Sequence, residues 1–426
     1  MNYPNVLVVS HNCFSDSGSN GRTLANFFEG YPIQKLAQLY IYNENPIVST
    51  CDNYYRVTDM DAVKSVFSSQ YGGIIKREQA HQERKPDDPH HSIKKTPLIC
   101  CVRELVWNIG RWNNKRLWKW IDDFNPEVIL FQAGDAAFLF NFVRKLAQKR
   151  DIPLVIYNSE GYYFKEFDYF RSSGIHKLMY PVFHRQFCRA FRKCIKMAKM
   201  SIYCCEKLKT DYDAEFGLPS EVIPTVTQVQ PGDKTADNDN LQIVYMGNLG
   251  VGRQEGLVEI GCVLQRINPS LKLQVYGKIP NTIVQKAFDD CPGIEYKGFV
   301  SYEQVVQIMY SSDILVHTES FTDFYREDLK YAFSTKIADC LASGRCFMLY
   351  APAGMACTEY LRNYDAAHVV ETAGELQNVL THLCSNKDLR EKKLENARAL
   401  VLEKHNPQIN TRRFQEILCE CVKDVY

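Results

Sequence analysis

The stretch AFSTKIADCLASGRCFMLYAPAGMACTEY (residues 332–360) decides the fold class. An apolar run, DILVHTES (313–320), precedes it, and a second run, CFMLYAP (346–352), lies within it. Both runs are typical of buried parallel strands. Between them a helical pattern starts at Ser-Thr-Lys (334–336) and ends before Gly344, which suits the left-handed residue after a helix. Strand, helix and strand in this order predict a doubly wound α/β sheet.

The amino end of this helix predicts an anion site. The hydroxyl of Ser334 or Thr335 can cap the helix by accepting a backbone N–H bond of its first turn. Lys336 places a full positive charge in the same turn, where the helix dipole disfavours it unless an anion binds there. We therefore expect these three residues to face a phosphate-bearing ligand beyond the strand ends.

The segment FSTKIADCLASG, followed by a strand and Ala-Pro, resembles the donor-binding segment of GT-B glycosyltransferases of family 4. In that family a carboxylate on this helix holds the donor ribose, and Asp339 stands in its place. The family's first Glu would stand eight residues earlier, where this chain has Tyr331. Glu319 supplies the missing carboxylate if residues 321–331 form an inserted loop.

The resemblance implies an α/β protein of GT-B architecture, with two Rossmann-like domains that face each other across a cleft. It spans the whole chain but is specific mainly from 243 to 360. The implied domains are as follows: an acceptor-binding domain at 1–227, a linker at 228–240, a donor-binding domain at 241–408 and a helix at 409–426 that packs back on the first domain.

A second glycine-rich loop, GNLGVGR (247–253), follows the strand that restarts the pattern after the linker. Its spacing does not fit a dinucleotide fingerprint. It is similar to the first loop of the family's donor domain, which implies donor contacts from Asn248 and Gly250. A basic residue there binds the donor diphosphate, and Arg253 can grip phosphate oxygens in a bidentate way. The family's second basic residue is Glu255 here, for which Lys336 could compensate.

The first half opens with a buried-strand run, NVLVVS (5–10), and a loop that contains Gly18 and Gly21. Such a loop lets backbone N–H groups approach a phosphate or a sugar, although a plain tight turn explains it equally well. In the resembling family this loop borders the acceptor and the donor diphosphate.

Two acidic residues follow later strands of this half. Asp135 ends the run NPEVILFQAGD, and Glu160 ends PLVIYNSE. Carboxylates at the ends of parallel strands face the ligand crevice of a doubly wound sheet. Either residue could contact acceptor hydroxyls and act as the general base, or it could simply cap the next helix.

Two cationic helical patterns also lie in this half. In the first, apolar residues recur at helical spacing, which favours core packing with a solvated charged face. These residues are Leu98, Val102, Leu105, Ile109 and Trp112, continued by Leu117, Trp120, Ile121 and Phe124. The second, 183–200, has phenylalanines along one side and six Arg or Lys elsewhere. The alternative for both is an interfacial element that touches anionic lipid.

Composition bounds the remaining classes. The 426 residues predict two domains, and a net charge of +1 excludes a nucleic-acid binder driven by bulk charge. The 16 cysteines include no C-x-x-C pair, so we expect buried free thiols. His90-His91 lie in a polar stretch (76–97) and lack a second ligand pair, so we expect no metal and no cofactor. With neither a signal peptide nor an 18-residue apolar run, we expect a cytoplasmic protein.

These features and the resemblance together predict a glycosyltransferase that moves a sugar from a nucleotide diphosphate sugar to a hydroxyl acceptor. The resemblance implies that the anomeric configuration is retained. Arg253 and Lys336 would stabilise the departing diphosphate, while Asp135, Glu160 or that phosphate would take the proton. The acceptor would be a growing bacterial surface saccharide, which could be lipid-linked at the inner face of the plasma membrane. The alternatives are a nucleotide-sugar epimerase or phosphorylase of similar fold, and a non-catalytic binding subunit, which Tyr331 and Glu255 motivate.

Overall fold

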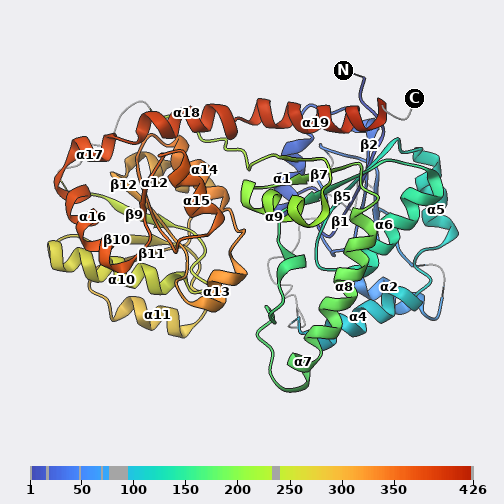
Figure 1. The fold of residues 1–426 in the computed structure, drawn as a ribbon, viewed down its shortest axis with the longest axis horizontal. Coiled ribbons are helices and arrows are strands. Elements are labelled where there is room, and N and C mark those ends of the chain that lie inside the picture. Colours follow the sequence, from blue (N-terminus) through green and yellow to red (C-terminus); the bar gives the residue numbers. More distant parts are fainter. Residues whose placement is uncertain are drawn as a thin grey trace. The chain divides into compact units, whose positions relative to one another are not determined.

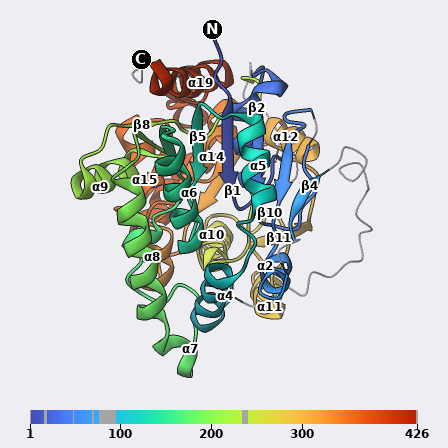
Figure 2. The same ribbon diagram turned by 90° about the vertical axis from the view of Figure 1, so that its right-hand side faces the viewer.

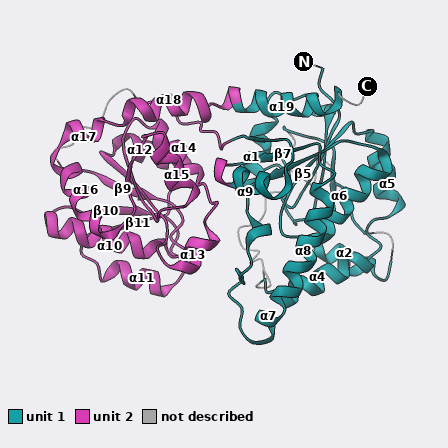
Figure 3. Cartoon of the chain, in the orientation of Figure 1, with its two compact units in different colours: residues 1–204, 208–223, 410–426 teal, residues 205–207, 224–409 magenta. Residues whose placement is uncertain are grey.

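Two largely parallel β-sheets, each flanked by helices, form the computed structural model of the protein (Figure 1). The structure describes residues 2–15, 19–47, 49–68, 71–75, 95–232 and 240–423. Each sheet belongs to its own unit (Figure 3). Unit 1 comprises residues 1–204, 208–223 and 410–426, and unit 2 comprises residues 205–207 and 224–409.

The sheet of unit 1 has the described strand order β4-β3-β2-β1-β5-β6-β7-β8. All neighbours run parallel except β3 and β4. Its central strands are buried along their whole length because helices cover both faces. The strands are β1 (Val6–Ser10), β2 (Leu36–Tyr40), β3 (Tyr54–Arg56), β4 (Gly73–Ile75), β5 (Val128–Gln132), β6 (Leu154–Asn158), β7 (Met200–Tyr203) and β8 (Ser220–Val222).

The helices of unit 1 include a group at one end, where α4 packs against α2, α6, α7 and α8 (Figure 2). The α-helices are α1 (Ser19–Phe27), α2 (Asp59–Ser65), α4 (Pro97–Ile109), α5 (Lys115–Phe124), α6 (Ala137–Arg150), α7 (Gly174–Leu178), α8 (Tyr180–Ile195), α9 (Glu206–Phe216) and α19 (Pro407–Lys423). Short 3₁₀ helices lie at Ile33–Lys35 and Tyr162–Phe164.

The end of the chain completes the core of unit 1. Phe414 on α19 stacks on Phe27 of α1, with ring centroids 4.3 Å apart. The Thr411 hydroxyl donates to the backbone oxygen of Asn26 at 3.0 Å. Residues 410–426 therefore belong to the same unit as the first strand, although almost 190 residues of unit 2 separate them from β8.

The sheet of unit 2 has the described order β11-β10-β9-β12-β13-β14, and all of its strands are parallel. Its strands are β9 (Ile243–Met246), β10 (Leu273–Tyr276), β11 (Ile294–Gly298), β12 (Ile314–Thr318), β13 (Cys346–Tyr350) and β14 (His368–Val370). Its helices are α10 (Arg253–Ile267), α11 (Thr282–Asp289), α12 (Tyr302–Ser311), α13 (Asp323–Asp328), α14 (Thr335–Ala342), α15 (Ala356–Asn363), α16 (Ala373–Ser385), α17 (Lys387–Glu391) and α18 (Leu394–Lys404).

The stretch that decides the fold class is built as predicted. It contributes α14 and β13, the run before it contributes β12, and the two strands pair in parallel. Ser334 is the N-cap of α14, and Gly344 follows the helix with φ +71°. A Cβ on Gly344 would lie only 2.6 Å from the backbone oxygen of Gly232, so glycine is needed for space as well as conformation. Residues 321–331, expected as an inserted loop, contain the short helix α13.

The core prediction for the first cationic pattern is confirmed after α4, where Trp112, Leu117, Trp120 and Ile121 are buried, but it is wrong for α4 itself. Val102, Leu105 and Ile109 are exposed, and the opposite side of the helix is buried instead, including Glu104 and Trp107. The prediction for α8 fared better, because its phenylalanines are buried as expected. That helix ends at Ile195, however, and Met200 already opens β7.

The cysteines are free thiols, as predicted, and most of them are buried. Within the described ranges, no three His, Cys, Asp or Glu side chains gather as a metal site would require. His90-His91 and residues 233–239 of the predicted linker lie outside these ranges. No helix in the described part of the chain has the length and apolar character needed to span a membrane.

Candidate functional site

The loop after β9 in unit 2 leads directly into α10. Gly252 precedes the helix with φ +79°, and a Cβ there would lie 2.4 Å from the Ser320 hydroxyl oxygen. The residue must be glycine for both reasons, since side chains rarely adopt this φ and no room exists for one. This close approach places Arg253, the first residue of α10, beside the end of β12.

Arg253 binds Glu319 through two parallel hydrogen bonds. Its Nε donates to Oε2 at 2.9 Å and its Nη2 donates to Oε1 at 2.7 Å. His317 Nε2 lies 3.0 Å from the same Oε1, and Glu319 is fully buried. Burial alone raises the pKa of a carboxyl, but the hydrogen bond with His317 and the charge of Arg253 hold the pKa of Glu319 below its usual value.

The predicted roles of these two residues change with this geometry. The bidentate face of the guanidinium, predicted to grip a diphosphate, binds Glu319 in the structure. Glu319, predicted to hold the donor, is fully buried and instead orients Arg253. A buried pair of this kind fixes the position of a charge, even where its net contribution to stability is small.

The amino end of α14 carries a second cation. The Ser334 hydroxyl accepts the backbone N–H of Lys336 at 3.4 Å, and Thr335 is the first helical residue. Lys336 is half-buried and makes no ion pair with any residue that the structure describes. Because α14 connects two parallel strands, its amino end lies at the carboxyl edge of the sheet, where Arg253 also lies.

Asp339 lies in the middle of α14 and is buried. The Thr227 hydroxyl donates to its Oδ1 at 2.6 Å. The carboxylate assigned to the donor ribose is thus held by a residue of unit 2 that precedes the predicted linker. In this structure Asp339 connects α14 to the segment around Thr227.

Asn248 and Gly250 shape the loop after β9. Asn248 Oδ1 accepts the backbone N–H of Gly250 at 2.8 Å, and the Asn248 carbonyl accepts the Tyr245 hydroxyl at 2.7 Å. The Asn248 residue itself is exposed. Hydrogen bonds therefore hold the loop in place while Asn248 stays exposed, which suits the predicted contact with a donor.

A second candidate site lies at the carboxyl edge of the sheet of unit 1. A small hollow of about 70 Å³ opens there, enough for a few waters or one sugar hydroxyl. Residues that follow β1, β2, β5 and β6 line it, together with Lys95 just before α4. Its charged and ring-bearing lining residues are His11, Tyr42, Lys95, Asp135, Glu160 and Tyr162. The structure thus brings together the two acidic residues that the sequence singled out.

His11 and Asp135 form the electrostatic centre of this hollow. Nε2 of His11 lies 3.9 Å from Oδ1 of Asp135, and the Tyr169 hydroxyl donates to Oδ2 at 3.3 Å. Burial lowers the pKa of His11 to about 4. Burial raises the pKa of Asp135, but Lys95 and His11 outweigh it and bring that pKa below its usual value. A neutral imidazole therefore lies beside a carboxylate at pH 7, the arrangement that a general base requires.

Glu160 is more exposed than Asp135, and its Oε2 lies 3.8 Å from Nζ of the buried Lys165. Lys95 donates from Nζ to the Tyr42 hydroxyl at 3.2 Å. The rim of the hollow thus carries charges of both signs. Of the two carboxylates, Asp135 is the one that lies beside the His11 imidazole.

Several buried polar atoms at this edge make no hydrogen bond to any described residue. They are Oε1 of Gln132, both amide atoms of Asn158 and Nε2 of His11. Gln132 ends β5 and Asn158 ends β6. Because an unsatisfied buried polar group costs about 1–3 kcal/mol, such a cluster indicates a place where water or a ligand binds.

The two glycines predicted near this edge have different outcomes. Gly18 lies outside the described residues. Gly21 lies in α1, where a Cβ would come within 2.5 Å of the backbone oxygen of Cys13. Gly21 therefore lets α1 pack closely on the loop after β1.

His11 and Lys95 are absent from the sequence prediction. His11 follows the buried run NVLVVS directly, so the argument used for Asp135 and Glu160 applies to it too. Gly134 also points to His11, but only in the structure, because a Cβ on Gly134 would lie 2.2 Å from the His11 ring. Lys95 lies in the polar stretch 76–97, where no feature of the sequence distinguishes it from the other charged residues.

Residues 259–418 match the protein family described as Glycosyl transferase-like. No curated protein matches the chain. Three solved structures cover almost all of it at low identity. A glycosyltransferase from Rickettsia africae ESF-5 is 14% identical, covers 99% of this chain and 100% of its own, and has a TM-score of 0.62. HepE (Alr3699) from Anabaena, in complex with UDP, is 10% identical, with coverages of 98% and 100% and a TM-score of 0.64.

The third structure, sucrose-phosphate synthase from Thermosynechococcus elongatus, is 10% identical, covers 98% of each chain and has a TM-score of 0.62. These similarities confirm the predicted fold, which is that of GT-B glycosyltransferases with two Rossmann-like units. The recognised family lies in the second half and includes α14 with Lys336.

Proposed function

We propose that this chain is a glycosyltransferase that transfers a sugar from a nucleotide diphosphate sugar to a hydroxyl acceptor. The observation that carries the proposal is the charge arrangement at the carboxyl edge of unit 2. There, Glu319 holds Arg253 in place, and Lys336 stands without an ion-pair partner among the described residues at the amino end of α14. The match of residues 259–418 to the Glycosyl transferase-like family supports it.

Unit 2 would bind the donor. As the bond between sugar and diphosphate breaks, negative charge grows on the diphosphate. Lys336 and the first N–H groups of α14 would stabilise that charge, and they need little reorganisation because the helix already holds them. Glu319 offsets the charge of Arg253 but fixes its guanidinium, whose Nη1 does not bind Glu319 and would donate to a phosphate oxygen.

Unit 1 would bind the acceptor. Its hydroxyl would enter the hollow at the strand ends and accept a hydrogen bond from a buried donor at this edge, such as Nδ2 of Asn158, which leaves its own proton for the base. Neutral His11 is the base that we assign to the acceptor proton, with Asp135 stabilising the imidazolium that forms. Glu160 at the rim would contact other acceptor hydroxyls.

The nature of the ligands is also part of the proposal. HepE structures contain UDP, UDP and glucose, or UDP-glucose, so a uridine diphosphate sugar is the first donor to test. WaaG, a lipopolysaccharide-biosynthesis glycosyltransferase that is 11% identical, has a TM-score of 0.55. We extend this to an acceptor that is a growing, lipid-linked surface saccharide at the inner face of a bacterial membrane. Retention of the anomeric configuration rests on the family resemblance.

A donor screen tests the proposal. The purified chain is heated with each of several nucleotide sugars, and a donor that binds the native state raises Tm by mass action. The same donor should then be hydrolysed slowly without acceptor. Lys336→Ala should lower this hydrolysis roughly hundredfold, whereas Lys272→Ala, at an exposed lysine that precedes β10, should not.

If the chain is instead a non-catalytic subunit, the donor should raise Tm without being hydrolysed. Lys336→Ala should then have no effect on donor hydrolysis. The anomeric proton of the first product, read by NMR against that of the donor, distinguishes retention from inversion.

A further inference from the structure

One end of unit 1 presents an apolar stripe to solvent. Val102, Leu105 and Ile109 on α4 are each more than half exposed, with Leu105 at 59%. Their spacing of three and four residues places them on one side of the helix. The opposite side is fixed inward because Glu104 accepts the backbone N–H of Phe138 on α6 at 2.9 Å.

The helices that pack against α4 continue this apolar surface. Ile175 and Leu178 on α7 are 62% and 76% exposed, and Val182 at the start of α8 is 53% exposed. Phe67, just after α2, is 86% exposed. In Figures 1 and 2 these helices gather at the end of unit 1 that lies opposite α19. Large exposed apolar side chains on adjacent elements mark a binding surface.

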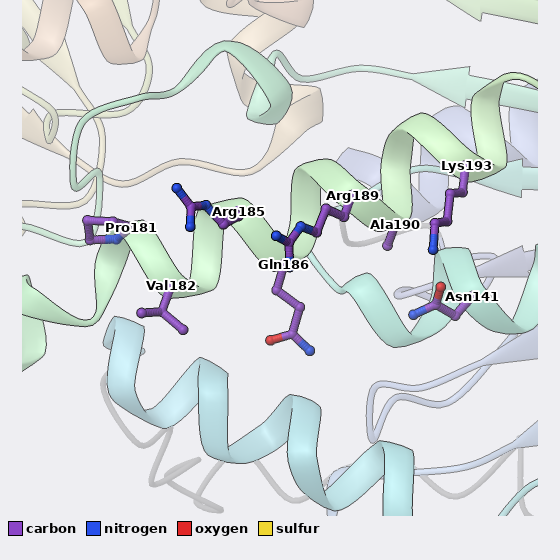
Figure 4. Close-up of a pocket in the computed structure, with 8 residues that line it drawn as sticks. All are labelled: Asn141, Pro181, Val182, Arg185, Gln186, Arg189, Ala190 and Lys193. Carbon is purple, nitrogen blue, oxygen red and sulfur yellow. The ribbon is translucent and has the colours of Figure 1, made fainter.

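Positive charges border this apolar surface along α8. Arg185, Arg189 and Lys193 are exposed and line a hollow of about 550 Å³ (Figure 4). Arg185 and Arg189 also border a second hollow of about 870 Å³, together with Arg192 and the carboxylates Glu166 and Glu215. Lys177 on α7 is exposed as well. Cations therefore outnumber carboxylates beside the apolar side chains.

We propose that this surface, formed by α4, α7, the amino-terminal half of α8 and Phe67, docks on an anionic lipid bilayer. Apolar side chains beside exposed Arg and Lys are the chemistry that an acidic membrane surface accepts: the first enter the headgroup region, and the second bind lipid phosphates. A second copy of the chain fits less well, because it would bring two cationic surfaces together.

The docking surface connects to the hollow that holds His11 and Asp135. Lys95 lines that hollow, and the adjacent Thr96 caps α4 and lies 3.0 Å from Nδ1 of His176 on α7, measured from its hydroxyl oxygen. Tyr169 contacts Asp135 through its hydroxyl and the ring of Tyr180 on α8. A lipid-linked acceptor would thus pass from the bilayer to the base; this step rests on the proposed function, whereas docking does not.

Vesicle binding of the full chain tests docking. We expect co-sedimentation with vesicles of phosphatidylglycerol and phosphatidylcholine, much weaker binding to phosphatidylcholine alone, and weakening as salt rises. Equal binding to both vesicles, or no binding to either, would overturn the proposal.

Two variants separate the contributions. Val102→Ser/Leu105→Ser/Ile109→Ser should reduce partitioning about tenfold or more through lost apolar contact. Arg185→Gln/Arg189→Gln should reduce it about tenfold and flatten its salt dependence. The matched controls are Ile283→Ser, an exposed apolar residue of unit 2, and Lys272→Gln/Lys278→Gln, two exposed lysines there. All four should unfold at the wild-type Tm.

A variant that binds vesicles like wild type overturns the assignment of its residues to the surface. A concentration-dependent dimer without vesicles, abolished by the α4 variant, would assign the surface to a second copy instead. Donor hydrolysis in solution serves as the independent readout. If it persists while vesicle binding is absent, docking fails and the transferase proposal stands; if it is absent while vesicle binding occurs, the reverse holds.

Discussion

The two candidate sites hold their charges in opposite ways. In unit 2, Glu319 binds both Arg253 and His317, so the position of the guanidinium is fixed before any ligand arrives. In unit 1, polar atoms of Gln132, Asn158 and His11 lie buried without hydrogen bonds to described residues. A site that binds a ligand of constant charge can be fully hydrogen-bonded before the ligand arrives. A site that abstracts a proton needs polar atoms that form their hydrogen bonds only when the substrate is bound.

The most damaging single change should be Glu319→Ala. It leaves Arg253 buried without a counter-charge, which costs about 3–5 kcal/mol of unfolding free energy in comparable pairs. Urea denaturation measures the loss. The double variant Arg253→Met/Glu319→Leu should recover most of this stability yet bind donor poorly. A small effect of Glu319→Ala would mean that Arg253 finds water or another partner.

The next largest effect should separate the two sites kinetically. Lys336→Met should lower donor hydrolysis and sugar transfer together, since it acts on the leaving group. His11→Asn should lower transfer by about 10²–10⁴-fold, the range for a lost general base, and leave donor hydrolysis unchanged. Equal losses in both reactions for His11→Asn would move the imidazole from the acceptor side to the donor.

A pH series sharpens the comparison further. The folded chain holds the pKa of His11 near 4 instead of the usual 6.5, so between these values the unfolded chain binds more protons. The contribution of His11 to stability should therefore fall by about 3 kcal/mol as pH decreases from 6.5 to 4. In His11→Gln the total change in unfolding free energy over this window should differ from that of wild type by that amount. Glu319, whose pKa is held below its usual value, loses its stabilising effect only as pH falls below that usual value.

The smallest effect concerns Asp339. Thr227→Val removes the hydroxyl that donates to its carboxylate and should cost about 1–2 kcal/mol in urea denaturation. Thr227→Ser, which keeps the donor, is the matched control. If Asp339 also holds the donor ribose, as the resemblance implies, Thr227→Val should raise the donor KM; an unchanged KM would leave Asp339 a packing residue.

The sequence predicted what local patterns determine. The buried runs became β12 and β13, and the caps of α14 at Ser334 and Gly344 follow from neighbouring residues alone. It failed on α4, because helical periodicity shows that Leu105 and Ile109 share a side but not whether another element covers that side. In α4 the buried side carries Glu104, whose cost of burial is offset by a bond to a backbone 34 residues away.

For the candidate sites, too, the sequence predicted what local patterns determine and missed what long-range contacts determine. Strand ends located Asp135, Glu160 and the loop of Arg253, since topology places them at one edge. The partner of Arg253 could not be predicted, because Glu319 lies 66 residues further on. His11 was within reach of the strand-end argument but carries no acidic signature.

The return of residues 410–426 to unit 1 has a consequence for biosynthesis. The ribosome synthesises residues 224–409 of unit 2 before Phe414, so the ring stack on Phe27 cannot form until those residues have been translated. Unit 2 can thus mature first, while the core of unit 1 is still incomplete. Chaperones that hold incomplete domains would meet the N-terminal half of this protein for longer than its position in the message suggests.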